Sequence, residues 1–221
     1  MNKIPDPIKE VFAELRDEIT SLHARWKIYR ELFAHSEERT KLLKKSAPTF
    51  FVFIHEVLID HIQLSIGKLT DPPGTGDKQN LSLRMLHRQV LELHDENLSS
   101  KLESILVELC GDEASNKVGK CTPIKTHRNK RIAHFDYKTA IPHGIDPLPG
   151  VSRQMIEDVL LLMRDYMNTI ERYFCQSAYL YQSPMIGPYD TEALLTILKD
   201  GLEFRRLEVE SLQKQYGLSD C

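Results

Sequence analysis

The stretch IKEVFAELRDEITSLHARWKIYRELF, from Ile8 to Phe33, decides the fold class of this 221-residue chain. Its large apolar side chains recur every three or four residues, a spacing that places them on one face of an α-helix. A half-buried strand would instead alternate with a period of two. We therefore predict one long amphipathic helix, started by Asp6 and Pro7. Its apolar stripe consists of Ile8, Phe12, Leu15, Ile19, Leu22, Trp26, Tyr29 and Phe33.

The same helical spacing continues along the rest of the chain, and strand-like alternation is hard to find. Ser36 and Thr122 are predicted as N-caps of the helices that follow them. Residues 138–150, with three prolines and two glycines, are predicted to form a loop. We predict an all-α, up-and-down helical bundle in a single domain spanning residues 1–221. The further helices are expected over residues 49–71, 81–93, 98–109, 152–174 and 191–216, and from Thr122 onward.

The composition bounds the functions that this chain can have. With a net charge of −3, it does not bind nucleic acid by bulk positive charge, so any such contact is local. Its four cysteines are scattered and include no C-x-x-C pair, which fits a reduced, cytoplasmic protein. The first residues lack the apolar segment of a signal peptide, and no apolar run approaches the length of a membrane span. We therefore expect neither export nor membrane insertion.

One local segment departs from this acidic balance. The stretch HRNKRIAHFD, residues 127–136, carries three fixed positive charges and two histidines. All of it except Asp136 lies within residues 114–135, which contain no carboxylate. We expect an anionic partner at this segment. Its lysines and arginines are Lys117, Lys120, Lys125, Arg128, Lys130 and Arg131.

The residue types in this segment suit cleavage of RNA without a metal ion. Arg128 stays protonated, and its planar guanidinium binds a phosphate through two parallel hydrogen bonds. His134, with an ordinary pKa near ~6.5, takes a proton from a ribose 2′-hydroxyl or gives one to the leaving oxygen. Together they favour attack of that hydroxyl on the neighbouring phosphate. The alternative interpretation is a solvated positive face on an acidic protein.

Other chemistries lack their motifs. His55 and His61 are six residues apart, whereas the H-E-x-x-H helix of zinc proteases needs a spacing of four. The chain contains no P-loop, no G-x-G-x-x-G and no G-x-S-x-G. We therefore predict that the protein uses no metal ion and no cofactor.

The stretch RNKRIAH resembles the signature of HEPN domains, in which an arginine, a polar residue and a histidine lie in an α-helical bundle. More closely, LSIGKLTDPPGTGDKQNLSLRML at residues 64–86, followed by THRNKRIAHFD, is similar to the AbiU-like HEPN proteins of bacterial abortive-infection and toxin systems. The resemblance covers roughly residues 45–140. It implies a homodimeric, metal-independent endoribonuclease whose arginines and histidines meet at the two-fold axis. It also implies a cognate antitoxin or nucleotidyltransferase as partner.

Under this resemblance, Arg128, Asn129 and His134 match the signature and are the catalytic candidates. In some HEPN toxins, a partner nucleotidyltransferase modifies a tyrosine two residues after the histidine. Asp136 occupies that position here and Tyr137 comes one residue later, which places this regulation in doubt. Contacts to RNA or phosphate are assigned to His127, Lys130, Arg131 and Lys125.

The arginine-to-histidine spacing by itself occurs four times, beginning at Arg16, Arg30, Arg88 and Arg128. The first three arginines have acidic neighbours in the sequence, and only Arg128 is followed by an asparagine in a carboxylate-free segment. Residues six apart on a regular α-helix point about 120° away from each other. A two-fold dimer solves this problem, because it brings Arg128 of one subunit to His134 of the other. Within one subunit, His127, Arg131 and His134 are expected to share a helix face.

Two functions stay open at this point. The first is an RNase toxin or defence effector. The second is a non-catalytic helical module that binds RNA, a nucleotide or a protein partner through the same basic patch. Both predict anion binding and dimers, so only RNA cleavage separates them.

Overall fold

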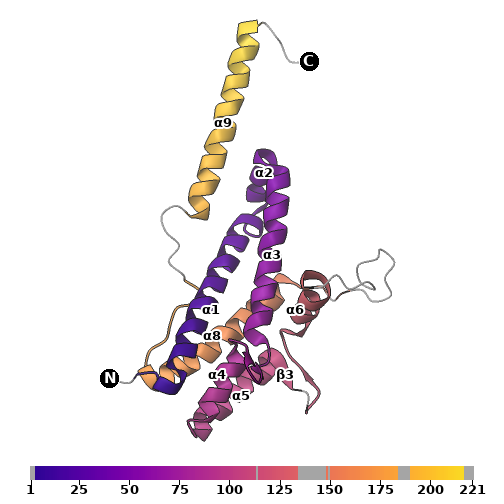
Figure 1. Ribbon diagram of the computed structural model, residues 1–221. Helices are drawn as coiled ribbons and strands as arrows, with labels where there is room; N and C mark the ends of the chain where they lie inside the picture. Colours follow the sequence, from indigo (N-terminus) through magenta and orange to yellow (C-terminus); the bar gives the residue numbers. More distant parts are fainter. Residues whose placement is uncertain (1–2, 113, 134–147, 149, 184–189, 217–221) are drawn as a thin grey trace. The chain divides into compact units, whose positions relative to one another are not determined.

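The predicted all-α class is confirmed by the computed structural model, which describes residues 3–112, 114–133, 148, 150–183 and 190–216 (Figure 1). Within these residues, β structure is confined to two short antiparallel hairpins. The helices are α1 (Asp6–Phe33), α2 (Glu37–Ser46), α3 (Pro48–Thr70), α4 (Leu83–Leu91), α5 (Glu96–Cys110), α6 (Thr122–His127), the π-helix η1 (Arg128–Ile132), α8 (Arg153–Cys175) and α9 (Thr191–Tyr216). The strands are β1 (Gly74–Thr75), β2 (Lys78–Gln79), β3 (Gly111–Asp112) and β4 (Lys117–Val118). The predicted loop at residues 138–150 lies largely outside the described residues.

Short polar side chains set several helix starts. The predicted cap at Ser36 is confirmed, because its hydroxyl accepts a hydrogen bond from the backbone N–H of Arg39 at 3.3 Å. The predicted cap at Thr122 is wrong: α6 begins at Thr122 itself, and Cys121 precedes it without a side-chain cap bond. Pro123 has no N–H to satisfy and fits either early helix position, so the sequence did not fix this boundary to the residue.

The described residues pack as two compact units. The first unit comprises described residues of 1–24 and 60–184, and the second comprises described residues of 25–59 and 185–221. Helices α1 and α3 contribute residues to both units. The single-domain organisation stays a prediction.

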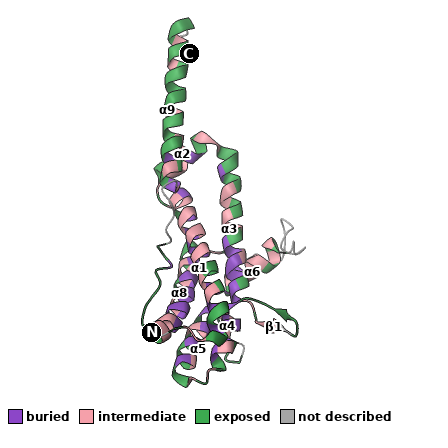
Figure 2. Cartoon of the chain, turned by 60° about the vertical axis from the view of Figure 1, so that its left-hand side comes forward, coloured by how far each residue is buried: buried purple, intermediate pink, exposed green. Residues whose placement is uncertain are grey.

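The first unit has a continuous apolar core. The stripe of α1 from Ile8 to Leu22 is almost completely buried, as predicted. Helix α5 packs against both α4 and α8, and Figure 2 shows buried residues along all three. The C-terminal half of α3 adds Ile62, Ile66 and Leu69 to this core. This unit therefore holds α6 and η1, which carry the basic segment, against well-packed helices.

The second unit is built around aromatic and branched side chains. Trp26 is only 3% exposed and stacks on Tyr29 at a ring separation of 5.1 Å. His55 packs between Tyr29 and Phe33 and lies 3.1 Å from the Tyr29 hydroxyl. His55 is thus a packed histidine. The neighbouring buried cluster consists of Leu32, Leu43, Phe51 and Leu195.

Helix α3 corrects one prediction about membranes. By length and composition alone it is long and apolar enough to cross a bilayer, so the expectation that no apolar run approaches that length is wrong. Its C-terminal half contributes to the core of the first unit, and 28% of the apolar window in this helix is buried. Its N-terminal half exposes Phe50, Phe53 and Val57.

His23 of α1 is a buried titratable group in the first unit. Its side chain is 5% exposed, and its ring lies 6.3 Å from that of Tyr181. Burial, followed by the positive charge of Arg164, lowers the pKa of His23 to about 4. The folded protein therefore binds a proton at this site more weakly than the unfolded chain does.

We predict that this histidine makes the fold acid-sensitive. Because the pKa of His23 falls from 6.5 unfolded to about 4 folded, stability is complete above pH ~6.5 and declines as the pH drops toward 4, by up to ~3 kcal/mol. Urea unfolding at several pH values measures this slope. His23→Gln is expected to flatten it, whereas the exposed His94→Gln leaves it unchanged. Equal slopes for wild type and His23→Gln would contradict the assignment.

Candidate functional site

The basic segment is helical, but its helix is not regular. Helix α6 runs directly into η1, where the N–H of Ala133 donates to the carbonyl of Arg128 at 2.8 Å, a bond of the i+5 type. Single π turns of this kind are rare and often lie at functional sites. The α-helical geometry assumed for the face shared by His127, Arg131 and His134 therefore does not apply here. His134 itself, like Asp136 and Tyr137, lies outside the described residues.

Arg128 is held by a carboxylate that directly follows α3. Its Nη1 lies 2.6 Å from Oδ2 of Asp71, and its Nη2 donates to Oδ1 of the same residue at 3.1 Å. Its Nε donates to Oδ1 of the adjacent Asn129 at 2.8 Å. The Arg128 side chain is only 13% exposed. These contacts use three of the five guanidinium N–H groups and fix the plane of the group.

The end of α3 leaves room for the Arg128 side chain, and the residue that follows it supplies the carboxylate that pairs with Arg128. A Cβ atom added at Gly67 would lie 2.4 Å from Cδ of Arg128 and 2.7 Å from its Nη1. Asp71 follows four residues later, which is one helical turn, so both residues face Arg128. Gly67 and Asp71 thus form a seat for Arg128: Gly67 leaves room for the side chain, and Asp71 pairs with its guanidinium. Sequence reasoning missed this role, although both residues lie within the family-like stretch at residues 64–86.

Asp71 also interacts with a second cation. The Nζ of Lys125 lies 3.4 Å from its Oδ1 and donates to the carbonyl of Thr70 at 3.3 Å. One carboxylate therefore faces two permanent positive charges, Lys125 and Arg128. We call these three side chains the Asp71 cluster. The cluster keeps a net charge of +1, so Asp71 reduces but does not cancel the attraction for an anion.

The carboxylate-free character of the basic segment is a property of the sequence and does not hold in space. Asp71 pairs with Arg128, and Asp158 of α8 accepts from Lys120 at 3.3 Å. The charge argument that separated Arg128 from the other three arginines is therefore wrong. The reason is that tertiary packing brings the carboxylate that follows α3 and one from α8 beside the basic segment, and no local window of sequence contains them.

The remaining predicted contacts are distributed around the cluster. His127 is half-buried, and burial together with the charge of Arg131 lowers its pKa, against an opposing effect of Asp60. Its Nδ1 is buried and has no hydrogen-bond partner among the described residues. A neutral imidazole at this position accepts a proton or a hydrogen bond more readily than it attracts phosphate by charge. Lys130 is half-buried, and Arg131 and Asn129 are exposed.

The structure thus brings Lys125, Arg128 and Asn129 together around Asp71 and sets His127 close to Arg131. In the part of the chain that the structure describes, no three His, Cys, Asp or Glu side chains are placed to hold a metal ion.

The family of this chain follows from its sequence as a whole. The HEPN family model described as AbiU2 matches residues 5–182. The chain belongs to the AbiU2 family of HEPN proteins. By its family it is an abortive-infection, toxin-type HEPN module, and HEPN domains are generally RNases. No curated protein and no solved structure matches the chain.

The match to the family model is wider than the resemblance to AbiU-like proteins over residues 45–140. It includes Gly67, Asp71 and the whole basic segment, so the seat for Arg128 lies within the AbiU2 region. Helix α9 lies beyond the matched residues.

We predict that Gly67→Ala destabilises the protein, because its new methyl group displaces the Arg128 side chain from Asp71. Overpacking of this kind costs about 1–3 kcal/mol, and the helix propensity of alanine offsets about 1 kcal/mol of it, so a net loss of up to about 2 kcal/mol is expected. The matched control is Gly201→Ala in the interior of α9, where an added Cβ meets nothing within 4 Å. That substitution is expected to stabilise by about 1 kcal/mol through helix propensity alone. Urea unfolding compares the two, and equal stabilisation by both would show that Arg128 needs no seat.

Proposed function

We propose that this protein is a metal-independent endoribonuclease of a bacterial toxin or phage-defence system and that it acts in the cytoplasm. RNA is cut by attack of a 2′-hydroxyl on the neighbouring phosphate. The observation that carries the proposal is the seat for Arg128, in which Gly67, Asp71 and Asn129 hold one guanidinium of the HEPN signature in a fixed orientation.

A fixed guanidinium suits the charge that develops in this reaction. Two N–H groups of Arg128, one on Nη1 and one on Nη2, are not used by Asp71 or Asn129. They point to different sides of the guanidinium, so each suits one phosphate oxygen. Because the seat is formed before substrate binds, little reorganisation is needed as negative charge grows on the phosphorane oxygens. Lys125 adds a second positive charge at the same cluster.

The other candidates take distinct roles in this mechanism. Asn129 has no titratable proton, so it acts as a positioning residue through its bond to Nε of Arg128. His134, supplied by the other subunit at the two-fold axis, transfers the proton, as base for the 2′-hydroxyl or as acid for the leaving 5′ oxygen. His127 contributes a neutral hydrogen-bonding group, and Lys130 and Arg131 supply phosphate contacts that do not read sequence.

A second candidate function is a non-catalytic HEPN module that binds RNA, a nucleotide or a protein partner through the same patch. It is favoured by the ion pair itself, because a carboxylate of this chain already occupies two donors of Arg128. In that case Arg128 mainly joins α3 to η1, and the exposed Arg131 meets the partner. The two candidates differ in whether RNA is cut.

We predict that the protein cuts single-stranded RNA in the presence of EDTA and leaves a 2′,3′-cyclic phosphate. His134→Ala is expected to lower the rate by ~10²–10⁴, because it removes general acid–base catalysis. Arg128→Lys keeps the charge and loses the bidentate fork, so cleavage is expected to fall further than RNA binding. Gel electrophoresis of end-labelled RNA and analysis of the product ends provide the measurements.

The control histidine for this assay is His94, which is exposed. His23 is unsuitable, since its replacement disturbs the core of the first unit. Arg128→Ala leaves Asp71 with Lys125 as its cationic partner within the cluster, so its thermal melting has to be compared with that of wild type before its activity is interpreted. Loss of cleavage in EDTA, or equal damage by His94→Ala and His134→Ala, would refute the site. Tight binding of RNA without cleavage supports the second candidate.

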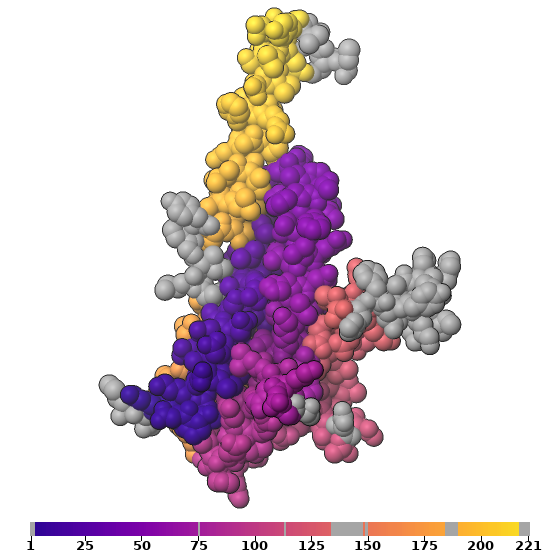
Figure 3. Space-filling view, viewed as in Figure 1, coloured from indigo at the N-terminus to yellow at the C-terminus, as the bar shows by residue number. Residues whose placement is uncertain are grey.

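We further propose that the protein is a homodimer in which exposed apolar faces of the second unit meet. In α9, Leu195 belongs to the buried cluster with Leu32, Leu43 and Phe51, and Leu198 packs against it. After Arg205, the same heptad spacing carries Val209, Leu212 and Tyr216. These last three are 49%, 48% and 69% exposed. Figures 2 and 3 show this part of α9 uncovered beyond its contact with α2. Since the stripe is buried where a partner exists, we assign its remainder to a second copy.

Light scattering at micromolar concentration is expected to give twice the 25.6 kDa mass of the chain. The double variant Val209→Ser, Leu212→Ser is expected to be monomeric and still folded, because about half of each side chain is exposed in one subunit. Arg206→Ala serves as the control, since Arg206 pairs with Glu203 and Glu210 of its own helix. A wild-type mass of 25.6 kDa would exclude the dimer, and a dimeric double variant would exclude α9 as its interface.

A further inference from the structure

Two cysteines that are scattered in the sequence lie side by side in the first unit. Cys110 ends α5 and Cys121 precedes α6, and their side chains are hydrogen-bonded to each other. The hairpin β3–β4 joins them, and backbone bonds from Lys120 to Glu108 and from Cys121 to Leu109 close it at 3.0 and 2.9 Å. The two thiols are therefore held together by the backbone on either side of them.

Gly119 makes this close approach possible. A Cβ atom at Gly119 would lie 2.2 Å from the carbonyl carbon of Cys110, and the nearby atoms belong to the backbone, which cannot move aside. Only a residue without a side chain lets the segment before α6 lie this close to the end of α5.

The two thiols differ in how readily they lose a proton. The hydrogen bond from Cys121 lowers the pKa of Cys110, and Arg84 lowers it further, whereas burial opposes both effects. The same hydrogen bond, with burial, raises the pKa of Cys121. Cys110 therefore loses its proton more readily than Cys121, and the guanidinium of Arg84 lies beside it.

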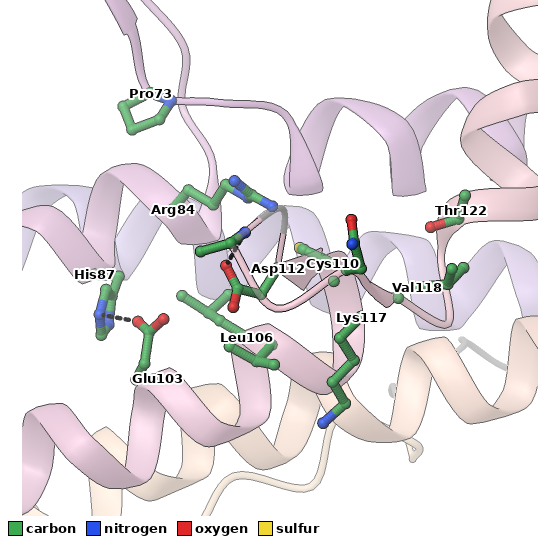
Figure 4. A pocket seen from close by; sticks show the side chains of 15 residues that line it. Pro73, Arg84, His87, Glu103, Leu106, Cys110, Asp112, Lys117, Val118 and Thr122 are labelled. Atoms are coloured by element: carbon green, nitrogen blue, oxygen red, sulfur yellow. Dashed lines mark hydrogen bonds and ion pairs between the residues drawn. The ribbon is translucent and has the colours of Figure 1, made fainter.

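The two sulfur atoms also differ in access. Cys110 is half-buried and lines an open pocket of about 810 Å³, together with Arg84, His87 and Glu103 (Figure 4). Cys121 is completely buried. A small reagent in this pocket meets Cys110 first and reaches Cys121 only through it.

We propose that Cys110 and Cys121 form a redox-active dithiol site for small hydroperoxides, with Cys110 as the attacking thiolate and Cys121 as the resolving thiol. In the first step, an S–O bond forms and the O–O bond breaks. Sulfur is oxidised by two electrons to a sulfenic acid, and the hydroperoxide leaves as an alkoxide or hydroxide that takes a proton from water. In the second step, Cys121 attacks Cys110, an S–S bond forms, and the hydroxyl leaves as water with the thiol proton of Cys121. A thiol reductant restores the pair.

This site adjoins the Asp71 cluster but does not depend on RNA cleavage. Cys121 is hydrogen-bonded to Thr70, the last residue of α3, and the carbonyl of Thr70 accepts from Lys125. Asp71 is the next residue in the chain. Oxidation thus changes the residue that packs directly behind the seat for Arg128.

The test treats the reduced, full-length protein with hydrogen peroxide, blocks remaining thiols with an alkylating agent and digests the protein with trypsin. Cleavage after Lys117 and Lys120 separates Cys110 from Cys121, so a disulfide joins peptides 102–117 and 121–125 in the mass spectrum. These linked peptides are expected to form first and to vanish on reduction, while Cys175 still carries the alkylating label.

Two variants check the assigned roles. In Cys121→Ser, the linked peptides are expected to be lost and Cys110 to proceed to the sulfinic acid, because no resolving thiol is present. Cys175→Ser is the matched control and is expected to give the same linked peptides as wild type. The proposal is overturned if Cys175 oxidises as fast as Cys110, if Cys110 links to Cys175 or Cys221, or if peroxide leaves Cys110 and Cys121 fully alkylatable.

Discussion

The ion pair between Asp71 and Arg128 is the constraint on which the candidate site depends. It joins the C-terminal end of α3 to the start of η1 through two hydrogen bonds to one carboxylate, in a position where Arg128 is mostly buried. Burial of a charged pair is costly unless each charge is satisfied, and here Asn129 and Lys125 supply the additional contacts. Loss of either partner would leave a desolvated charge, so the pair fixes both elements together.

This constraint explains how a protein of net charge −3 offers a positive site. Two cations share Asp71, and Lys130 and Arg131 follow in the π turn, so the local charge stays positive although carboxylates lie nearby. A site of this kind attracts phosphate at short range without making the whole surface basic. It also orients the guanidinium before a ligand arrives, which is how an enzyme stabilises charge that develops only in the transition state.

Two glycines near the site allow close contacts that a side chain would block. Gly67 admits the Arg128 side chain, and Gly119 lets the segment before α6 approach the end of α5. Both glycines act through the absence of a Cβ, and both bring chemistry-bearing groups from distant parts of the sequence into contact. The Asp71 cluster and the pair of cysteines lie on either side of Thr70, so the end of α3 supports both.

The sequence by itself determined the helical fold and the family. The stripe from Ile8 to Tyr29 is buried as its spacing predicted, because a helix places every third or fourth residue on one face whatever packs against it. Ser36 capped its helix, because a cap acts through local backbone groups. The RNKRIAH stretch marked the HEPN resemblance in the same way, through residues adjacent in the chain.

Only the tertiary structure decided what surrounds Arg128. Asp71 lies 57 residues before Arg128, and no local pattern predicts that its carboxylate will face this guanidinium. The π turn likewise could not be read from spacing, since one shifted hydrogen bond changes the angle between side chains without changing the sequence pattern. Cys110 and Cys121 meet only because a hairpin and a glycine bring their backbones together. Charge, access and proton affinity at each group depend on neighbours in space, and packing between distant segments sets those neighbours.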